Sequence, residues 1–287
     1  MATLRAGCIL AVFILITLVL LPLQWAAVRL HLPARRSIPQ RYHRFVCWLF
    51  GVRIAVVGAA ADGGALLTAN HTGWLDIPIL SAVAPVSFIS KSEVGQWPFF
   101  GTLARLQRSI FIRRERTKAL DDRNNIRRRL LEGDALVIFP EGTSSDGNRV
   151  LPFRSALFSA AELDLGRGAL HPVHAQVQPV SIAYVGLHGM PMGRENRPLY
   201  AWYGDMDLLP HLWESLKTGP MDVVVEFHDP LTIDTAGGRK QLAARCEAAV
   251  RAGLIRALSG SHVEPTPAQQ DEALLEALGE AESEEAA

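Results

Sequence analysis

The hydrophobic pattern of this chain changes near residue 51. Before that point, positions 6 to 28 carry no charged residue, and positions 9 to 23 are almost wholly apolar. After it, short runs of β-branched and apolar residues alternate with segments of helical spacing. The first pattern is typical of a membrane segment and the second of an α/β domain, so the chain is predicted to contain both.

The N-terminal apolar segment is long enough to cross a bilayer. As an α-helix its 23 uncharged residues would extend about 35 Å, against a hydrocarbon core of about 30 Å. Pro22 can kink such a helix without abolishing it. A cleaved signal peptide fits less well, because the run is long and no small-x-small site precedes a plausible mature start. A buried core helix is the alternative, and hydropathy is compatible both with a spanning helix and with one that dips into the membrane and returns.

Basic residues follow this segment and indicate its orientation. Five arginines lie between residues 29 and 44, whereas only Arg5 and the amino terminus precede the segment. By the positive-inside rule, the following domain faces the cytoplasm at the inner (cytoplasmic) membrane. Residues 37–50 mix basic and aromatic side chains, which predicts an amphipathic helix in the interface with Trp48 as an aromatic anchor. Residues 1–50 are therefore expected to form membrane-anchoring helices.

Residues 51–260 are predicted to form one domain in which strands and helices alternate. This order indicates an α/β fold with a mostly parallel sheet covered by helices. Residues 186–198 are expected to form a long polar loop. The expected strands are 54–57, 65–69, 86–89, 109–112, 135–139, 177–184 and 223–227, and the expected helices are 77–83, 99–106, 117–131, 155–163, 208–216 and 239–258.

The formal net charge is zero, but the charges are unevenly distributed. No Lys or Arg follows Arg256, and eight acids lie beyond it, so residues 261–287 are predicted to be an acidic, disordered tail. The rest of the chain has 29 basic residues against 21 acidic ones. This excess suits anionic small ligands or an anionic membrane surface, and it is too small and too scattered to predict nucleic-acid binding.

Candidate acid–base chemistry lies between the strand expected at 65–69 and the helix expected at 77–83. The turn there reads Asn-His-Thr-Gly-Trp-Leu-Asp from residue 70 to residue 76. Asp76 can accept one ring N–H of His71, fix its tautomer and leave the other nitrogen free as a general base. With nine histidines in the chain, a His-x4-Asp spacing arises by chance about as often as not, so the spacing alone has little weight.

A second polar segment follows the strand expected at 135–139. It contains Glu141, Gly142 and Thr143. Glycine lets the backbone approach a ligand closely, and exposed N–H groups there can hold an oxyanion or a phosphate. An ordinary turn explains this segment equally well when it is taken alone.

The strand expected at 109–112 runs into a cluster of arginines that begins at Arg113. A guanidinium group presents a planar fork that matches carboxylate or phosphate oxygens, so this cluster suits an anionic headgroup. The basic residues at 127–129 are better explained as a solvated or membrane-facing surface.

Together these segments resemble the signature blocks of the PlsC-type lysophospholipid acyltransferases, which include the 1-acyl-sn-glycerol-3-phosphate acyltransferases. The matching blocks are residues 70–76 and 139–143, the Phe-Ile-Arg of 111–113, and the Val-Gln-Pro-Val-Ser-Ile of 177–182. Any one block is a weak signal, but four in the family's order are specific. A membrane-associated N-terminus is also similar to the family.

The resemblance implies a reaction and the residues that perform it. His71 would deprotonate the free hydroxyl of a lysolipid, which attacks the thioester of acyl-ACP or acyl-CoA, and Asp76 would orient His71. Residues 141–143 would position the acceptor, Arg113 would bind its anionic group, and Pro179 would help to shape the wall of the site. The transfer requires no metal or other cofactor.

One departure from the family concerns the acceptor. In its glycerol-phosphate enzymes an Arg usually follows Glu-Gly-Thr, whereas this chain has Ser144. Losing that Arg removes a charge-assisted bond of about 1.5–3 kcal/mol. Formation of phosphatidic acid from 1-acyl-sn-glycerol-3-phosphate is still the first prediction, because it is the commonest activity of the family. O-acylation of a lyso-ornithine lipid, which forms ornithine lipid, is the alternative.

If the protein belonged to another class, its motifs and these residues would have different properties. A metal-dependent hydrolase would use His71, Asp76 and Glu141 as ligands and would hold a stoichiometric ion. A serine hydrolase would need Gly-x-Ser-x-Gly, which the chain lacks. A non-catalytic membrane adaptor would tolerate any substitution at His71.

Overall fold

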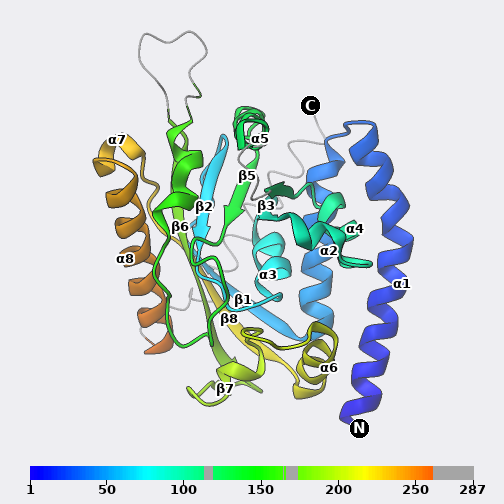
Figure 1. Cartoon of the computed structure of the whole chain (residues 1–287). Helices are drawn as coiled ribbons and strands as arrows, with labels where there is room; N and C mark the ends of the chain where they lie inside the picture. Colours follow the sequence, from blue (N-terminus) through cyan, green and yellow to red (C-terminus); the bar gives the residue numbers. More distant parts are fainter. Residues whose placement is uncertain (113–118, 164, 166–173, 261–287) are drawn as a thin grey trace, which may run out of the picture.

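The structure is a computed structural model that describes residues 1–112, 119–163, 165 and 174–260. An eight-stranded sheet in the order β1-β8-β6-β2-β5-β3-β4, with β7 beside β6, forms its centre (Figure 1). Five neighbouring pairs are parallel, and β6 pairs antiparallel with β8 and β7, so the predicted α/β fold with a mostly parallel sheet is confirmed. The strands are β1 (Val52–Val57), β2 (Ala65–Ala69), β3 (Val86–Lys91), β4 (Ile110–Ile112), β5 (Ala135–Ile138), β6 (Gln176–Leu187), β7 (Met190–Pro191) and β8 (Met221–Phe227).

Helices cover both faces of this sheet. Figure 1 shows α1, α2, α3, α4 and α6 on one side and α7 and α8 on the other. The α-helices are α1 (Ala2–Arg29), α2 (Ala34–Phe50), α3 (Asp76–Val83), α4 (Phe100–Leu106), α5 (Ala119–Leu131), α6 (Leu208–Thr218), α7 (Ile233–Ala236) and α8 (Arg239–Leu258), and the short 3₁₀ helices are η1 (Ser92–Gln96), η3 (Ser155–Glu162) and η4 (Arg197–Leu199).

The central strands are buried on both faces, which explains their continuous apolar sequences. Successive side chains of a strand point to opposite faces, so Leu67 and Val137 contribute to the core beneath α2, α3 and α6. Leu66 and Leu136 contribute to the second core, beneath α5 and α8. The turns that leave the carboxyl ends of β2 and β5 are thereby held on a rigid support.

The helix predicted at 155–163 is confirmed as a 3₁₀ helix over residues 155–162. Another segment differs from the sequence prediction. The loop expected at 186–198 contains a β-hairpin, because β6 continues to Leu187 and returns as β7. His188 and Gly189 both have positive φ angles, of 54° and 80°, which is the conformation of a two-residue type I′ turn. The tail predicted at 261–287 lies outside the described residues.

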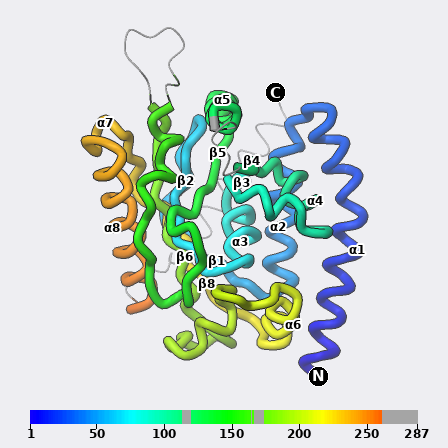
Figure 2. Tube along the Cα trace, viewed as in Figure 1, coloured from blue at the N-terminus to red at the C-terminus, as the bar shows by residue number. Residues whose placement is uncertain are grey.

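The first two helices form an antiparallel pair that lies along the domain (Figures 1 and 2). The buried residues of α1 fall on one face of the helix, toward α2, α4 and α6. Arg5 donates to the carbonyl oxygen of Leu216 at 2.7 Å, and Gln24 donates to that of Leu106 at 2.8 Å. The helix is therefore fastened to the domain near both of its ends.

The opposite side of α1 is apolar and exposed. Leu15, Leu18 and Trp25 expose more than half of their side-chain surface. By length and composition, α1 is able to cross a membrane. An apolar face of this size on a helix that already packs against the domain is suited to contact with lipid.

Candidate active site

His71 and Asp76 form a hydrogen-bonded pair at the carboxyl end of β2. His71 lies in the turn after the strand, and Asp76 is the first residue of α3. Nδ1 of His71 lies 2.8 Å from Oδ2 of Asp76, and the same oxygen accepts the backbone N–H groups of Thr72 at 2.6 Å and Gly73 at 2.9 Å. Because Oδ2 acts as an acceptor toward these amides, Nδ1 carries the ring proton and Nε2 is free to accept one.

The two members of this pair differ in their access to solvent. The Asp76 side chain is fully buried, whereas the His71 side chain is 21% exposed. His71 is therefore able to meet a substrate while Asp76 is shielded from water, which strengthens the interaction between them.

Two other loops hold the turn in place. The backbone N–H of Ser145 donates to the carbonyl oxygen of His71 at 2.8 Å, and that of Trp202 donates to the carbonyl oxygen of Thr72 at 3.0 Å. A Cβ atom at Gly73 would lie 2.8 Å from the Trp202 nitrogen, so only glycine permits this approach. Three segments that are far apart in the sequence thus meet around His71.

The segment after β5 contacts His71 through Phe139 and Glu141. The Phe139 ring stacks on the His71 imidazole, and Glu141 is only 2% exposed. The His71 backbone N–H donates to Oε1 of Glu141 at 3.4 Å. Burial raises the pKa of the Glu141 carboxyl to about 8, against the opposite effect of the His71 and Leu151 backbone N–H groups. Glu141 is therefore mainly protonated at neutral pH and lies beneath the turn.

The other predicted acceptor-binding residues lie nearer the surface. Gly142 is half-buried with a positive φ of 71°, and Thr143 is exposed. A Cβ atom at Gly142 would lie 3.2 Å from the guanidinium carbon of Arg154, so the glycine makes room for that cation. Arg113 lies outside the described residues.

Lys91 is a candidate functional residue that the sequence analysis did not identify. It ends β3, where it is paired with Ile112 of β4. Its Nζ donates to the carbonyl oxygen of Gly142 at 3.3 Å, and the bond is exposed. The available signal was a lysine at the carboxyl end of a largely buried strand, at the edge of the sheet where ligands are bound.

The block at 177–182 contributes to the site through a residue just beyond it. Pro179 lies within β6 opposite Thr68, and its carbonyl oxygen accepts the backbone N–H of His228. The β6 residue that contacts the His71–Asp76 pair is Tyr184, whose hydroxyl donates to Oδ1 of Asp76 at 2.8 Å. Sequence reasoning placed Tyr184 only at the end of a strand.

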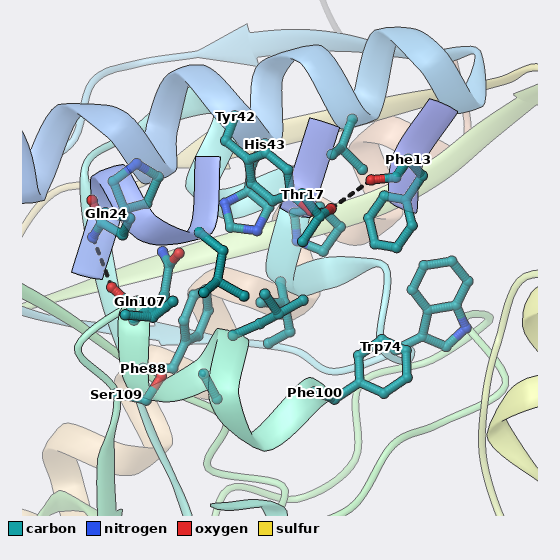
Figure 3. Close-up of a pocket in the computed structure, with 18 of the residues that line it drawn as sticks. Phe13, Thr17, Gln24, Tyr42, His43, Trp74, Phe88, Phe100, Gln107 and Ser109 are labelled. Carbon is teal, nitrogen blue, oxygen red and sulfur yellow. Dashed lines mark hydrogen bonds between the residues drawn. The ribbon is translucent and has the colours of Figure 1, made fainter. Parts of the chain in front are cut away.

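An apolar cavity of about 230 Å³ lies between the N-terminal helices and the domain (Figure 3). Phe13 of α1, Phe88 of β3 and Phe100 of α4 line it, and Trp74 connects it to the turn between His71 and Asp76. Phe88 also stacks on Phe139, with ring centroids 6.3 Å apart. A cavity of this composition suits an alkyl chain.

The donor set for a metal is limited. Among residues 1–112, 119–163, 165 and 174–260, no three His, Cys, Asp or Glu side chains form a group that could hold a metal ion. Asp76 instead accepts hydrogen bonds on both of its oxygens.

The fold and the paired His and Asp define an α/β acyltransferase, and comparisons with known proteins agree. A family model described as "Acyltransferase" matches residues 53–183. The lyso-ornithine lipid O-acyltransferase of Brucella abortus (strain 2308) is 46% identical over 263 residues, which cover 91% of this chain and 98% of that protein. The 1-acyl-sn-glycerol-3-phosphate acyltransferase of Neisseria gonorrhoeae is 33% identical over 178 residues, covering 62% of this chain and 64% of the relative.

A solved structure has the same fold. The 1-acyl-sn-glycerophosphate acyltransferase from Thermotoga maritima superposes with a TM-score of 0.60 at 20% identity, covering 89% of this chain and 97% of that one. The chain belongs to the lysolipid acyltransferase family that the sequence motifs predicted. It is an O-acyltransferase that acts on a lysolipid acceptor in association with a membrane.

Proposed function

We propose that His71 is the general base of the acyl transfer. The observation that carries this proposal is the bond between His71 Nδ1 and Asp76, because it leaves Nε2 free to accept a proton at a partly exposed position. Nε2 takes the proton of the lysolipid hydroxyl as the oxygen forms a bond to the acyl carbonyl carbon. The carbon–sulfur bond of the thioester then breaks, and the imidazolium returns the proton to the leaving thiolate.

Asp76 orients the imidazole and stabilises the imidazolium. The acceptor brings the nucleophile itself, so no acyl-enzyme is required. The acyl donor is acyl-ACP or acyl-CoA, which acts as a co-substrate, and we propose no metal or other cofactor. The apolar cavity beside Trp74 would hold an acyl chain.

The acceptor that we place first is a lyso-ornithine lipid, although the family match covers both acceptors. Ser144 stands where the glycerol-phosphate enzymes usually have Arg, and its hydroxyl donates to the carbonyl oxygen of Trp202 at 2.5 Å. Ser144 therefore connects its own loop to the loop of Trp202, and it offers no positive charge to an acceptor phosphate. The relative from Brucella abortus, which matches over nearly its whole length, is named for this acceptor.

Formation of phosphatidic acid from 1-acyl-sn-glycerol-3-phosphate, which ranked first from the sequence, is the second candidate. Lys91 and Arg154 are compatible with it, because both cations lie beside Gly142. With Arg113, they would bind the anionic group of either acceptor, a carboxylate or a phosphate. Gly142 and Thr143 would position that group, while buried Glu141 supports the turn.

The membrane face that we propose is the exposed apolar side of α1. Exposed Arg29, Arg41 and Arg44 would then face anionic headgroups, and the excess of arginines after α1 would place the domain in the cytoplasm, at the inner membrane. The acceptor would reach His71 from the same lipid layer.

Membranes that contain the protein, supplied with radiolabelled acyl-ACP and equal amounts of the two acceptors, test the proposal. We expect acylation of lyso-ornithine lipid to exceed acylation of 1-acyl-sn-glycerol-3-phosphate, and His71→Ala to reduce both to the background. Activity on the glycerol phosphate alone would reverse the order of the acceptors. Full activity of His71→Ala would contradict the assignment of the base.

A further inference from the structure

Tyr184 shares the carboxylate of Asp76 with His71. The hydroxyl of Tyr184 donates to Oδ1 of Asp76 at 2.8 Å, whereas His71 and two backbone N–H groups occupy Oδ2. The Tyr184 side chain is 1% exposed and that of Asp76 is fully buried. Within the part of the chain that the structure describes, Oδ1 has no other hydrogen-bond donor.

The backbone on either side of Tyr184 is also fixed. The side-chain amide of Asn70 donates to the carbonyl oxygen of Ile182 at 2.9 Å and accepts its N–H at 2.8 Å, so Asn70 pairs with β6 as a strand residue would. Ile182 and Tyr184 are two positions apart and therefore point to the same face of the sheet. Nε of buried Arg197 donates to the carbonyl oxygen of Tyr184 at 3.2 Å.

This arrangement links the register of β6 to the catalytic turn. Asn70 directly precedes His71, and its pairing with Ile182 sets which β6 side chain faces Asp76. Burial and the charge of Asp76 raise the pKa of the Tyr184 hydroxyl well above its ordinary value. Tyr184 is therefore a neutral donor at any working pH.

We propose that Tyr184 is a positioning residue for the acyl transfer, acting through Asp76. By holding Oδ1, it fixes the rotation of the carboxylate about its Cβ–Cγ bond, which keeps Oδ2 in line with Nδ1 of His71. Its hydrogen bond also stabilises the negative charge of the Asp76 carboxylate, which water cannot reach. The imidazolium that forms on His71 needs this charge beside it. This inference rests on the proposed roles of His71 and Asp76.

The test compares Tyr184→Phe with the matched variant Tyr200→Phe. Tyr200 is also fully buried, and its hydroxyl donates to the carbonyl oxygen of Gly219 at 3.0 Å, so both variants lose one buried phenol hydrogen bond. We expect Tyr184→Phe to lower kcat about 10- to 100-fold with the KM values of both substrates changed less than about twofold. Tyr200→Phe should keep kcat within about twofold to threefold.

A double-mutant cycle with Asp76→Asn separates an action through Asp76 from a general loss of stability. We expect Tyr184→Phe to cause no further loss of kcat in the Asp76→Asn background. Losses that multiply in the double variant would overturn the inference, as would a kcat of Tyr184→Phe equal to that of Tyr200→Phe. A Tyr184→Phe protein without a cooperative thermal transition would make Tyr184 a structural residue, which also overturns it.

The Asp76→Asn variant also distinguishes this inference from the proposed function. If Asp76→Asn retains full kcat, the proposed orienting role of Asp76 is wrong, and the inference about Tyr184 fails with it, whereas His71→Ala tests the base separately. If Asp76→Asn is inactive and Tyr184→Phe is normal, only the role of Tyr184 is wrong.

Discussion

The imidazole of His71 stacks on the phenyl ring of Phe139, with the ring centroids 4.0 Å apart and an angle of 17° between the planes. Asp76 fixes one edge of the imidazole by a hydrogen bond, and Phe139 fixes one of its faces. The ring therefore has little freedom to rotate out of the position in which Nε2, the proposed base, would meet the acceptor. Such contacts would preorganise His71 for that role.

Phe139→Leu should lower kcat about tenfold or more by releasing the face of the His71 ring. The stacking itself contributes about 0.5–1.5 kcal/mol, so we expect only a small loss of stability. Steady-state kinetics with a detergent-solubilised acceptor measure the effect. Phe153→Leu is the matched control, because Phe153 is a buried aromatic residue that packs against Phe158. Equal losses of kcat in the two variants would contradict the prediction.

Glu141→Gln should change how stability depends on pH. The pKa of about 8 lies above the ordinary value of 4.5, so the folded protein binds this proton more tightly than the unfolded chain. The stabilisation is complete below about pH 4.5 and declines as the pH rises to 8, by at most about 1.4 kcal/mol per unit. Glu141→Gln removes this dependence.

Thermal unfolding midpoints between pH 5 and 8 measure the pH dependence of stability. They are compared between the detergent-solubilised Glu141→Gln variant and the unaltered protein. Exposed Glu195 provides the control, because Glu195→Gln should retain the pH dependence of the unaltered protein. An unchanged slope in Glu141→Gln would show that Glu141 is not the group responsible.

Gly73→Ala should separate the catalytic turn from the loop that contains Trp202. The added Cβ would lie 2.8 Å from the Trp202 nitrogen and 3.0 Å from its Cβ, so one loop must move. We expect a loss of about 1–3 kcal/mol of stability and a large loss of kcat. Gly193→Ala is the control, since a Cβ atom there meets nothing within 4 Å. Normal kinetics of Gly73→Ala would show that the contact is unimportant.

Lys91→Met should raise the KM of the acceptor by about tenfold and leave the KM of the acyl donor unchanged, because a charge-assisted bond to the acceptor is lost. The substitution keeps an unbranched side chain of nearly the same length and removes its charge. Lys217→Met is a suitable control for the loss of a lysine charge, because Lys217 lies on α6 and is paired with Glu214. If the donor's KM rises instead, Lys91 contacts the thioester substrate.

Leu15→Asn combined with Leu18→Asn should weaken membrane association, since both side chains lie on the exposed side of α1. Flotation with liposomes of phosphatidylglycerol and phosphatidylethanolamine measures the bound fraction. Ile255→Asn, at an exposed position on α8, should float as the unaltered protein does. Equal flotation of all three proteins would exclude the outer side of α1 as the lipid contact.

Much of this protein is determined locally and is therefore readable from the sequence. The strands β2 and β5 are continuous apolar runs because they are buried on both faces, and such runs predict a parallel sheet wherever they alternate with helices. His71 and Asp76 are five residues apart on one turn, so their contact depends only on local geometry. The match to the acyltransferase family depends on the same short segments.

The remaining features depend on contacts between distant segments, which no local pattern specifies. Tyr184 meets Asp76 across 108 residues, because β6 pairs with β2 in one register that Asn70 extends. Burial beneath the turn makes Glu141 a neutral support, although its sequence context equally suits a ligand contact. The sequence by itself determined the fold class and the contact between His71 and Asp76. Tertiary packing decided which groups surround them, since burial and strand register exist only in the folded chain.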